Sequence, residues 1–236
     1  MRLPHRTRRI NPLVNIAIFG GTFDPIHSGH LQAAKAAARR YGLDRILFVP
    51  SGNPPHKVHD RLTLFHHRYA MVALACSGDP RFAASLLEAP KPGGRPHYSI
   101  DTTRKLKRTL SARDRLYFLI GADAFLDLPH WKEYRKLLDT VNVIVVSRPG
   151  FSTDDIWKIV PREAVLSIDR SLSPEWFQMQ RTSLHVLRGV HVPVAARDIR
   201  EAIRAGHRVT GLVPPLVEQY LVKEGLYRPA LPGSKR

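Results

Sequence analysis

The sequence lacks several features that define whole classes of protein. It contains one cysteine, Cys76, so no disulfide can form within the chain. No stretch approaches the roughly 20 consecutive apolar residues that a membrane-spanning helix needs. The basic N-terminus has no apolar segment long enough for a secretory signal. We therefore expect a cytoplasmic protein without a membrane partner. We also expect one domain at residues 15–226, with a disordered basic arm at 1–14 before it and a tail at 227–236 after it.

The sequence also lacks a cluster of metal-ligating residues, and its acidic residues are outnumbered by basic ones. The histidines are scattered, and the pair His66-His67 has no carboxylate or cysteine at ligand spacing, so we expect no metal site built by the protein. The chain has 20 acidic residues against 37 Lys and Arg, a net charge of +17. Such a charge attracts nucleotides, nucleic acid or acidic membrane surfaces without choosing among them. No aromatic-rich basic groove of the kind that stacks single-stranded bases is visible, so nucleic acid is not an expected partner.

The most informative stretch, residues 15–31, predicts a strand, a glycine loop and a helix. A short apolar run at 16–19 is followed by Gly20 and Gly21, which is typical of a buried parallel strand. Ser28 is suited to cap a helix that extends to Gly42.

This layout suits phosphate. Gly20 and Gly21 remove side chains where a phosphate must approach the backbone, and the amides and dipole of a helix start favour an anion. His27 and His30 lie at the same helix start, where each imidazole can donate a hydrogen bond to a phosphate oxygen.

Other apolar runs also end in polar residues. Runs at 45–49, 116–120 and 141–146 read as strands, and they are followed by the loop with Lys57, by Gly121 and Asp123, and by Arg148, respectively. The carboxyl ends of parallel strands meet at one sheet edge. We therefore predict an α/β fold, a Rossmann-like doubly wound, mostly parallel sheet with helices on both faces, and phosphate-binding side chains along one edge.

Further elements are predicted between these strands and after them. We expect a helix at 61–76 capped by Asp60, a strand at 82–87, a helix that Ser99 caps, and a helix at 154–159. The helix at 61–76 is apolar, so its Cys76 should be a buried, inert thiol. We expect residues 170–182 to be an irregular surface segment, and 184–194 to be a strand pair or a long edge strand.

The run Gly-Gly-Thr-Phe-Asp-Pro-Ile-His-Ser-Gly-His at residues 20–30 resembles the signature of the nucleotidylyltransferases. Its Gly-Thr-Phe-Asp-Pro-x-His form is most similar to that of bacterial nicotinate-nucleotide adenylyltransferases. The resemblance extends over 15–225 and includes Pro-Pro-His-Lys at 54–57, Tyr-Ser-Ile-Asp-Thr at 98–102, and Gly-Ala-Asp at 121–123 followed by Trp131. These elements favour nicotinate mononucleotide over phosphopantetheine or choline-type substrates.

The resemblance implies an activity. Such an enzyme transfers the adenylyl group of ATP to nicotinate mononucleotide, and the products are nicotinate adenine dinucleotide and pyrophosphate, in NAD biosynthesis. The attacking phosphate oxygen is already anionic, so catalysis rests on positioning and charge neutralisation. Mg²⁺ is implied as a cofactor, held mainly by the substrate phosphates and water. The expected partners are these two substrates, and the sequence leaves a monomer and a homodimer both open.

The resemblance also implies which residues do what. It assigns catalysis to His27, His30 and Lys57. It assigns ATP binding to Gly20, Gly21, Thr22, Phe23, His27, His30, Gly121, Asp123, Arg148 and Arg200. It assigns the binding of nicotinate mononucleotide to Asp24, Lys57, Tyr98, Ser99, Thr102 and Trp131. The indole of Trp131 would stack on the pyridine ring.

One segment departs from the family. Where the family has Ile-Ser-Ser/Ala-Thr-x-Ile-Arg, this chain has Val-Ala-Ala-Arg-Asp-Ile-Arg at 194–200, so the hydroxyls are absent while Ile199 and Arg200 remain. Backbone amides at the start of the helix would still bind phosphate there, and Arg197 is an alternative donor. Otherwise the ATP site is weaker than in the family. This departure and the net charge of +17 leave open a turnover-deficient homologue that binds nucleotides or nucleic acid. Separately, transfer to nicotinamide mononucleotide stays open as an alternative reaction.

Overall fold

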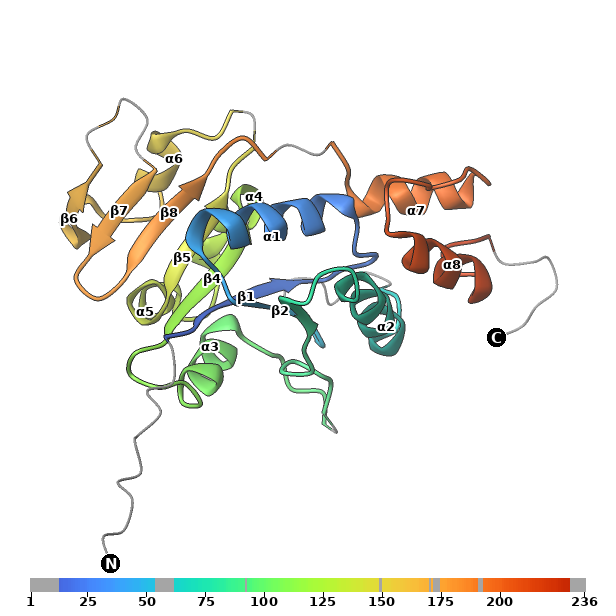
Figure 1. Ribbon diagram of the computed structural model, residues 1–236, viewed down its shortest axis with the longest axis horizontal. Coiled ribbons are helices and arrows are strands. Elements are labelled where there is room, and N and C mark those ends of the chain that lie inside the picture. The colour runs from blue at the N-terminus through green and yellow to red at the C-terminus, as the bar shows by residue number, and fades with distance from the viewer. Residues whose placement is uncertain are drawn as a thin grey trace, which may run out of the picture.

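An eight-stranded sheet with the strand order β3-β2-β1-β4-β5-β8-β7-β6 forms the centre of the molecule (Figure 1). The computed structural model describes residues 13–53, 62–91, 93–148, 150–169, 171, 175–190 and 193–229. The strands are β1 (Asn15–Gly21), β2 (Arg45–Pro50), β3 (Phe82–Ala84), β4 (Arg115–Gly121), β5 (Asn142–Val146), β6 (Val165–Ile168), β7 (Trp176–Met179) and β8 (Ser183–Leu187).

Helices follow most of the strands. They are α1 (Ser28–Tyr41), α2 (Phe65–Cys76), α3 (Ser99–Lys107), α4 (Ala122–Leu126), α5 (Tyr134–Thr140), α6 (Thr153–Trp157), α7 (Ala196–Arg204) and α8 (Pro215–Lys223), with short 3-10 turns η2 (Leu128–His130) and η3 (Arg162–Ala164). No helix in the described ranges is long and apolar enough to cross a membrane.

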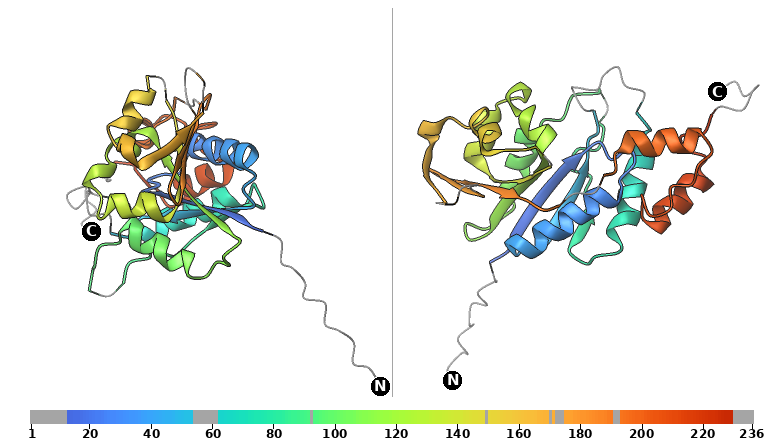
Figure 2. Two further views of the ribbon diagram at one scale, coloured as in Figure 1. Left: turned by 90° about the vertical axis from the view of Figure 1, so that its left-hand side faces the viewer. Right: turned by 90° about the horizontal axis from the view of Figure 1, so that it is seen from above.

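The helices cover both faces of the sheet, as Figure 2 shows. Successive strand residues point to opposite faces, so Ala17 and Phe19 of β1 join a core with α1, α2, α7 and α8. Ile18 of β1 and Phe118 of β4 join a second core with α3, α4, α5 and α6. The predicted doubly wound α/β fold is therefore confirmed, and Cys76 is buried as expected.

The strand order places the carboxyl ends of six neighbouring strands, in the order β3-β2-β1-β4-β5-β8, on one edge, because each pairs in parallel with the next. β1 pairs in parallel with β2 on one side and with β4 on the other, and β4 pairs in parallel with β5. The chain reverses its winding direction between β1 and β4. Open α/β sheets bind ligands in the crevice at such a switch point. The β1 glycines and Gly121 therefore lie where this architecture favours a ligand.

Three predictions about local structure were wrong. The strand expected at 184–194 is the short β8, and it lies inside the sheet because it pairs with both β5 and β7. β7 falls within 170–182, where we expected irregular chain. Ser28 is the first residue of α1, and His27 takes the cap position.

Helix boundaries elsewhere differ by a few residues. α2 begins at Phe65, later than predicted, and Asp60, its expected cap, lies outside the described residues. Tyr98 takes the cap position of α3 in place of Ser99. The predicted strand at 82–87 is shortened to β3.

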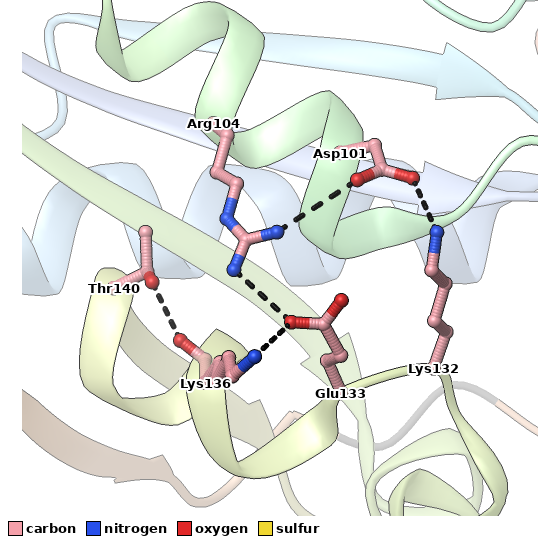
Figure 3. A network of polar contacts seen from close by, with 6 residues as sticks. All are labelled: Asp101, Arg104, Lys132, Glu133, Lys136 and Thr140. Carbon is pink, nitrogen blue, oxygen red and sulfur yellow. Dashed lines mark hydrogen bonds and ion pairs between the residues drawn. The ribbon is translucent and has the colours of Figure 1, made fainter.

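A polar network joins α3 to the segment before and within α5 (Figure 3). Arg104 of α3 pairs with Glu133 at 3.2 Å, and Lys132 Nζ lies 3.1 Å from an oxygen of Asp101. Glu133 also pairs with Lys136. Although exposed ion pairs contribute little singly, a network holds the loop containing Trp131 at the start of α3.

Candidate functional site

Two histidines stack at the start of α1. The ring centroids of His27 and His30 lie 3.7 Å apart with an interplanar angle of 31°. His30 is also enclosed by aromatic rings, since its centroid lies 5.0 Å from that of Phe23 and 5.9 Å from that of Phe19. The paired histidines predicted at this helix start are thus in contact with each other.

Both imidazoles are neutral at neutral pH. Burial lowers the pKa of His27 to about 4. The pKa of His30 lies well below its ordinary value, mainly because the ring is buried and to a smaller extent because His27 lies beside it. The backbone N–H of His27 donates to His30 Nδ1 at 3.3 Å, so the ring proton of a neutral His30 resides on Nε2. His30 is therefore a hydrogen-bond donor through Nε2, as a phosphate oxygen requires.

The first amides of α1 are partly occupied. The Ser28 N–H donates to the Leu212 carbonyl at 2.8 Å, and the His30 N–H donates to the His27 carbonyl at 3.0 Å. The helix start consequently offers an anion fewer amides than the sequence suggested. The imidazoles become the more important donors at this point.

The loop between β1 and α1 is tightly packed. A Cβ on Gly21 would lie 3.0 Å from the Phe23 ring, and one on Gly20 would lie 3.8 Å from the Phe118 ring. Phe23 itself has a φ of 51° and is buried. Glycine at position 21 thus makes room for the aromatic ring that covers His30.

Asp24 is buried in this loop and its carboxylate is occupied. Oδ1 accepts from the Tyr227 hydroxyl at 2.6 Å, and Oδ2 accepts from the Thr63 N–H at 3.2 Å. Arg200 of α7 donates to the Asp24 carbonyl at 2.7 Å. Asp24 and Arg200, expected as substrate ligands, are thus brought together at the loop and bind each other.

The ends of β4 and β5 also meet. Arg148 Nη1 forms an ion pair with Asp123 Oδ1, and both side chains are exposed. Exposed pairs contribute about 0–1 kcal/mol, so a ligand opens this contact at little cost. A Cβ on Gly121 would have no heavy atom within 4 Å, which fits an open approach to the backbone.

Trp131 and Tyr98 lie at the other face of the sheet. The Trp131 ring meets Phe118 edge to face at a centroid distance of 6.1 Å, and its Nε1 donates to Asp127. Lys132 Nζ lies 4.4 Å from the centroid of the Tyr98 ring. Phe118 therefore lies between Trp131 and Gly20, near the carboxyl end of β1.

Thr102 and Ser99 are placed differently. Thr102 is buried, and its hydroxyl donates to Glu88 Oε1 at 2.8 Å. Burial raises the pKa of Glu88. Ser99 is the first residue of α3. Thr102 thus supports the loop at 85–91, and a Cβ on the adjoining Gly52 would collide with the Glu88 carbonyl.

The start of α7 lacks a side-chain cap. Ala195 at the cap position makes no side-chain hydrogen bond, and the Ile199 N–H donates to the Ala195 carbonyl at 3.2 Å. Arg197 Nε donates to Glu201 at 2.8 Å along the helix surface. Arg197 is therefore engaged with its own helix, and backbone amides are what this end presents to an anion.

Lys57 lies outside the described residues, as does His56. A cleft of about 870 Å³ lies at the opposite edge of the sheet, at the amino ends of β4 and β5, where it is lined by Arg115, Asn142 and His185 among others. None of the site residues predicted from the sequence lines this cleft. It is a separate feature of the molecule.

Sequence reasoning missed two residues that hold the loop. Arg68 of α2 is only 2% exposed and donates to the Thr22 carbonyl at 2.8 Å, and Tyr227 reaches Asp24 from a distant part of the chain. A charged residue within the apolar helix 65–76 was a readable signal for Arg68. No local signal pointed to Tyr227, which the sequence analysis placed in the tail.

The chain is similar to known proteins over most of its length. Residues 18–184 match the family described as cytidylyltransferase-like. A protein of Solibacter usitatus named "Probable nicotinate-nucleotide adenylyltransferase" is 40% identical over 214 residues, which is 91% of this chain and 100% of that protein. A protein of the same name from Thermus thermophilus is 39% identical over 215 residues, with the same coverage. The nicotinic acid mononucleotide adenylyltransferase of Plasmodium falciparum, solved in complex with NaAD, superposes with a TM-score of 0.67 at 18% identity, over 91% of this chain and 97% of that one.

Proposed function

This chain belongs to the cytidylyltransferase-like family and, within it, to the nicotinate-nucleotide adenylyltransferases, and from that premise we propose that it transfers the adenylyl group of ATP to nicotinate mononucleotide. The products are nicotinate adenine dinucleotide and pyrophosphate. The observation that carries the proposal is the stacked, neutral pair of His27 and His30 at the start of α1, beside the switch point of the sheet.

The chemistry needs positioning more than a protein nucleophile. A phosphate oxygen of the mononucleotide attacks the α-phosphorus of ATP in line, a new P–O bond forms, and the bond to pyrophosphate breaks. His27 and His30 would donate hydrogen bonds to phosphate oxygens through ring N–H groups. Their donation counts most where negative charge accumulates in the transition state.

Other residues complete the ATP side. Asp123 would accept hydrogen bonds from ribose hydroxyls, and Arg148 would then turn to a phosphate. The amides at the start of α7 would bind the outgoing pyrophosphate, in place of the family's absent hydroxyls. Lys57, outside the described residues, would add a positive charge.

The mononucleotide side is assigned to the second face of the sheet. The indole of Trp131 is half-buried on Phe118, which leaves it partly accessible for stacking on an electron-poor pyridine ring. Tyr98 and Ser99 lie at the nearby start of α3. Lys132 Nζ lies over the Tyr98 ring and pairs with Asp101, and exchanging that partner for a ring carboxylate would favour the acid form of the ring over the amide.

Mg²⁺ would arrive with the triphosphate. The described residues contain no group of three His, Cys, Asp or Glu side chains that could hold a metal ion. Oxygens of the substrate phosphates and water satisfy Mg²⁺ in many nucleotide sites. Held in this way, the ion would supply charge neutralisation for the substrate phosphates.

The test measures pyrophosphate release from ATP, Mg²⁺ and nicotinate mononucleotide by the purified full chain. His30→Asn should lower kcat by about 100-fold, since it removes a donor to developing charge. His207→Asn, at an exposed histidine, is the matched control and should leave the rate unchanged. Release no faster with the wild-type chain than with His30→Asn would refute the function.

Nicotinamide mononucleotide is the second substrate to test, because the residues around Trp131 include both a cation, Lys132, and a carboxylate, Asp127, that can accept a hydrogen bond from an amide. We expect the acid to react faster at equal concentration. Equal rates with both acceptors would remove the assignment of acid specificity but leave adenylyl transfer intact.

A further inference from the structure

The loop that leads to the histidine pair is tied to the far end of the chain. The Tyr227 hydroxyl donates to Asp24 Oδ1 at 2.6 Å, across a sequence separation of 203 residues. Asp24 is 4% exposed, and Tyr227 is half-buried against the core. A short hydrogen bond to a buried carboxylate is among the stronger contacts in proteins, because the acceptor carries a full charge.

Three further elements hold the same loop. Arg68 of α2 donates from Nε to the Thr63 carbonyl at 2.9 Å and from Nη1 to the Thr22 carbonyl at 2.8 Å. The Thr63 N–H donates to Asp24 Oδ2, and Arg200 of α7 donates to the Asp24 carbonyl. Both carboxylate oxygens of Asp24 are therefore engaged by the protein itself.

The backbone on both sides of this contact is strained. Phe23 has a φ of 51° and Tyr227 has a φ of 65°, although neither is glycine. Such conformations are unfavourable for residues other than glycine and persist only where the surroundings over-determine them. Phe23 packs on His30, so the loop held by Tyr227 is also the loop that shapes the environment of the imidazole.

We propose that Tyr227 is a positioning residue for adenylyl transfer, and that it acts by anchoring Asp24 so that the loop at 22–25 keeps His27 and His30 in place. In this assignment Asp24 is an anchor point of the loop and does not contact the mononucleotide. The inference rests on the proposed function, because the histidines are the groups being positioned.

The alternative is that the contact only stabilises the fold. Tyr227→Phe separates the two, since it removes one hydroxyl and keeps the ring in the core. Misplacement of catalytic groups by a fraction of an ångström to an ångström lowers the rate strongly. We therefore expect kcat to fall on the order of 10- to 100-fold, while the KM for ATP changes by less than about threefold.

Tyr220→Phe is the matched control. Its hydroxyl lies 2.8 Å from His67 Nδ1, so the same substitution removes a comparable bond between the C-terminal helix and α2 that does not touch the loop. Its kcat should stay within about twofold of the wild-type value. Melting temperatures of both variants are measured, and rates are taken well below the lower one.

A double-mutant cycle with Asp24→Asn tests the route of the effect. If Tyr227 acts through Asp24, the double variant should lose kcat no further than Asp24→Asn alone, within about twofold. Independent, multiplying losses would overturn the inference, and so would a wild-type kcat in Tyr227→Phe or an equal loss in Tyr220→Phe. Absence of activity in the wild-type chain would instead refute the proposed function.

Discussion

Acidification from pH 7 to pH 5 should destabilise the fold, and His27 should account for a measurable share. In the unfolded chain an imidazole takes up a proton below its ordinary pKa of about 6.5. In the fold, burial lowers the pKa of His27 to about 4. Between these two values the unfolded state binds more protons, so the free energy of unfolding decreases as the pH falls.

The magnitude follows from the shift. At pH 5 the solution is about 1.5 units below the unfolded pKa, and each unit corresponds to about 1.4 kcal/mol, so His27 alone contributes a loss of about 2 kcal/mol. His30 has a pKa lowered for the same reason and adds a loss of the same sign. Carboxylates whose pKa is lowered, such as Asp79 and Asp169, lose their stabilising contribution mainly at more acidic pH.

Urea unfolding at pH 5 and pH 7, followed by tryptophan fluorescence, measures the effect. The decrease in the free energy of unfolding should be about 2 kcal/mol smaller in His27→Gln than in the wild type. The exposed His207→Gln serves as control and should show the wild-type decrease. An equal decrease in all three proteins would refute the argument that His27 is buried in its neutral form.

Three shorter predictions concern other parts of the structure. Trp131→Ala should raise the KM for nicotinate mononucleotide about 10-fold in steady-state assays, with little change for ATP, because it removes a stacking surface; a change confined to ATP would contradict the assignment. Gly52→Ala should lower the free energy of unfolding by about 1–3 kcal/mol in urea titrations, because its Cβ would collide with the Glu88 carbonyl, whereas Gly78→Ala, whose nearest atom lies at 4.0 Å, should not. Burial raises the pKa of Cys76 to about 12, so a thiol reagent should modify one cysteine per chain in urea and none in the native protein.

The parallel part of the sheet and its binding edge could be predicted, because the apolar runs mark the strands and the handedness of βαβ connections sets their arrangement. Apolar runs at 45–49, 116–120 and 141–146 each became a parallel strand, and the chirality of βαβ connections then set a common edge. The β6–β8 region was harder. Its strands are short, and β7 and β6 are antiparallel additions at the edge of the sheet, so neither length nor periodicity separated them from loops.

The site could be predicted only in part. Sequence spacing brought His27 and His30 to one helix start, since residues three apart share a helix face. It could not show that Asp24 and Arg200 bind each other, because that contact depends on how α7 packs against the β1–α1 loop. Nor could the sequence show that Tyr227 contacts Asp24. That contact depends on the path of the chain after the last helix and on the left-handed backbone conformation of Tyr227 itself.

The most direct test of the account is a crystal structure of the full chain with nicotinate adenine dinucleotide. We predict that the phosphates lie within hydrogen-bond distance of His27 and His30, with the nicotinate ring on Trp131 and a ribose at Asp123. A dinucleotide bound away from the carboxyl ends of β1 and β4, for example in the cleft at the amino ends of β4 and β5, would contradict it.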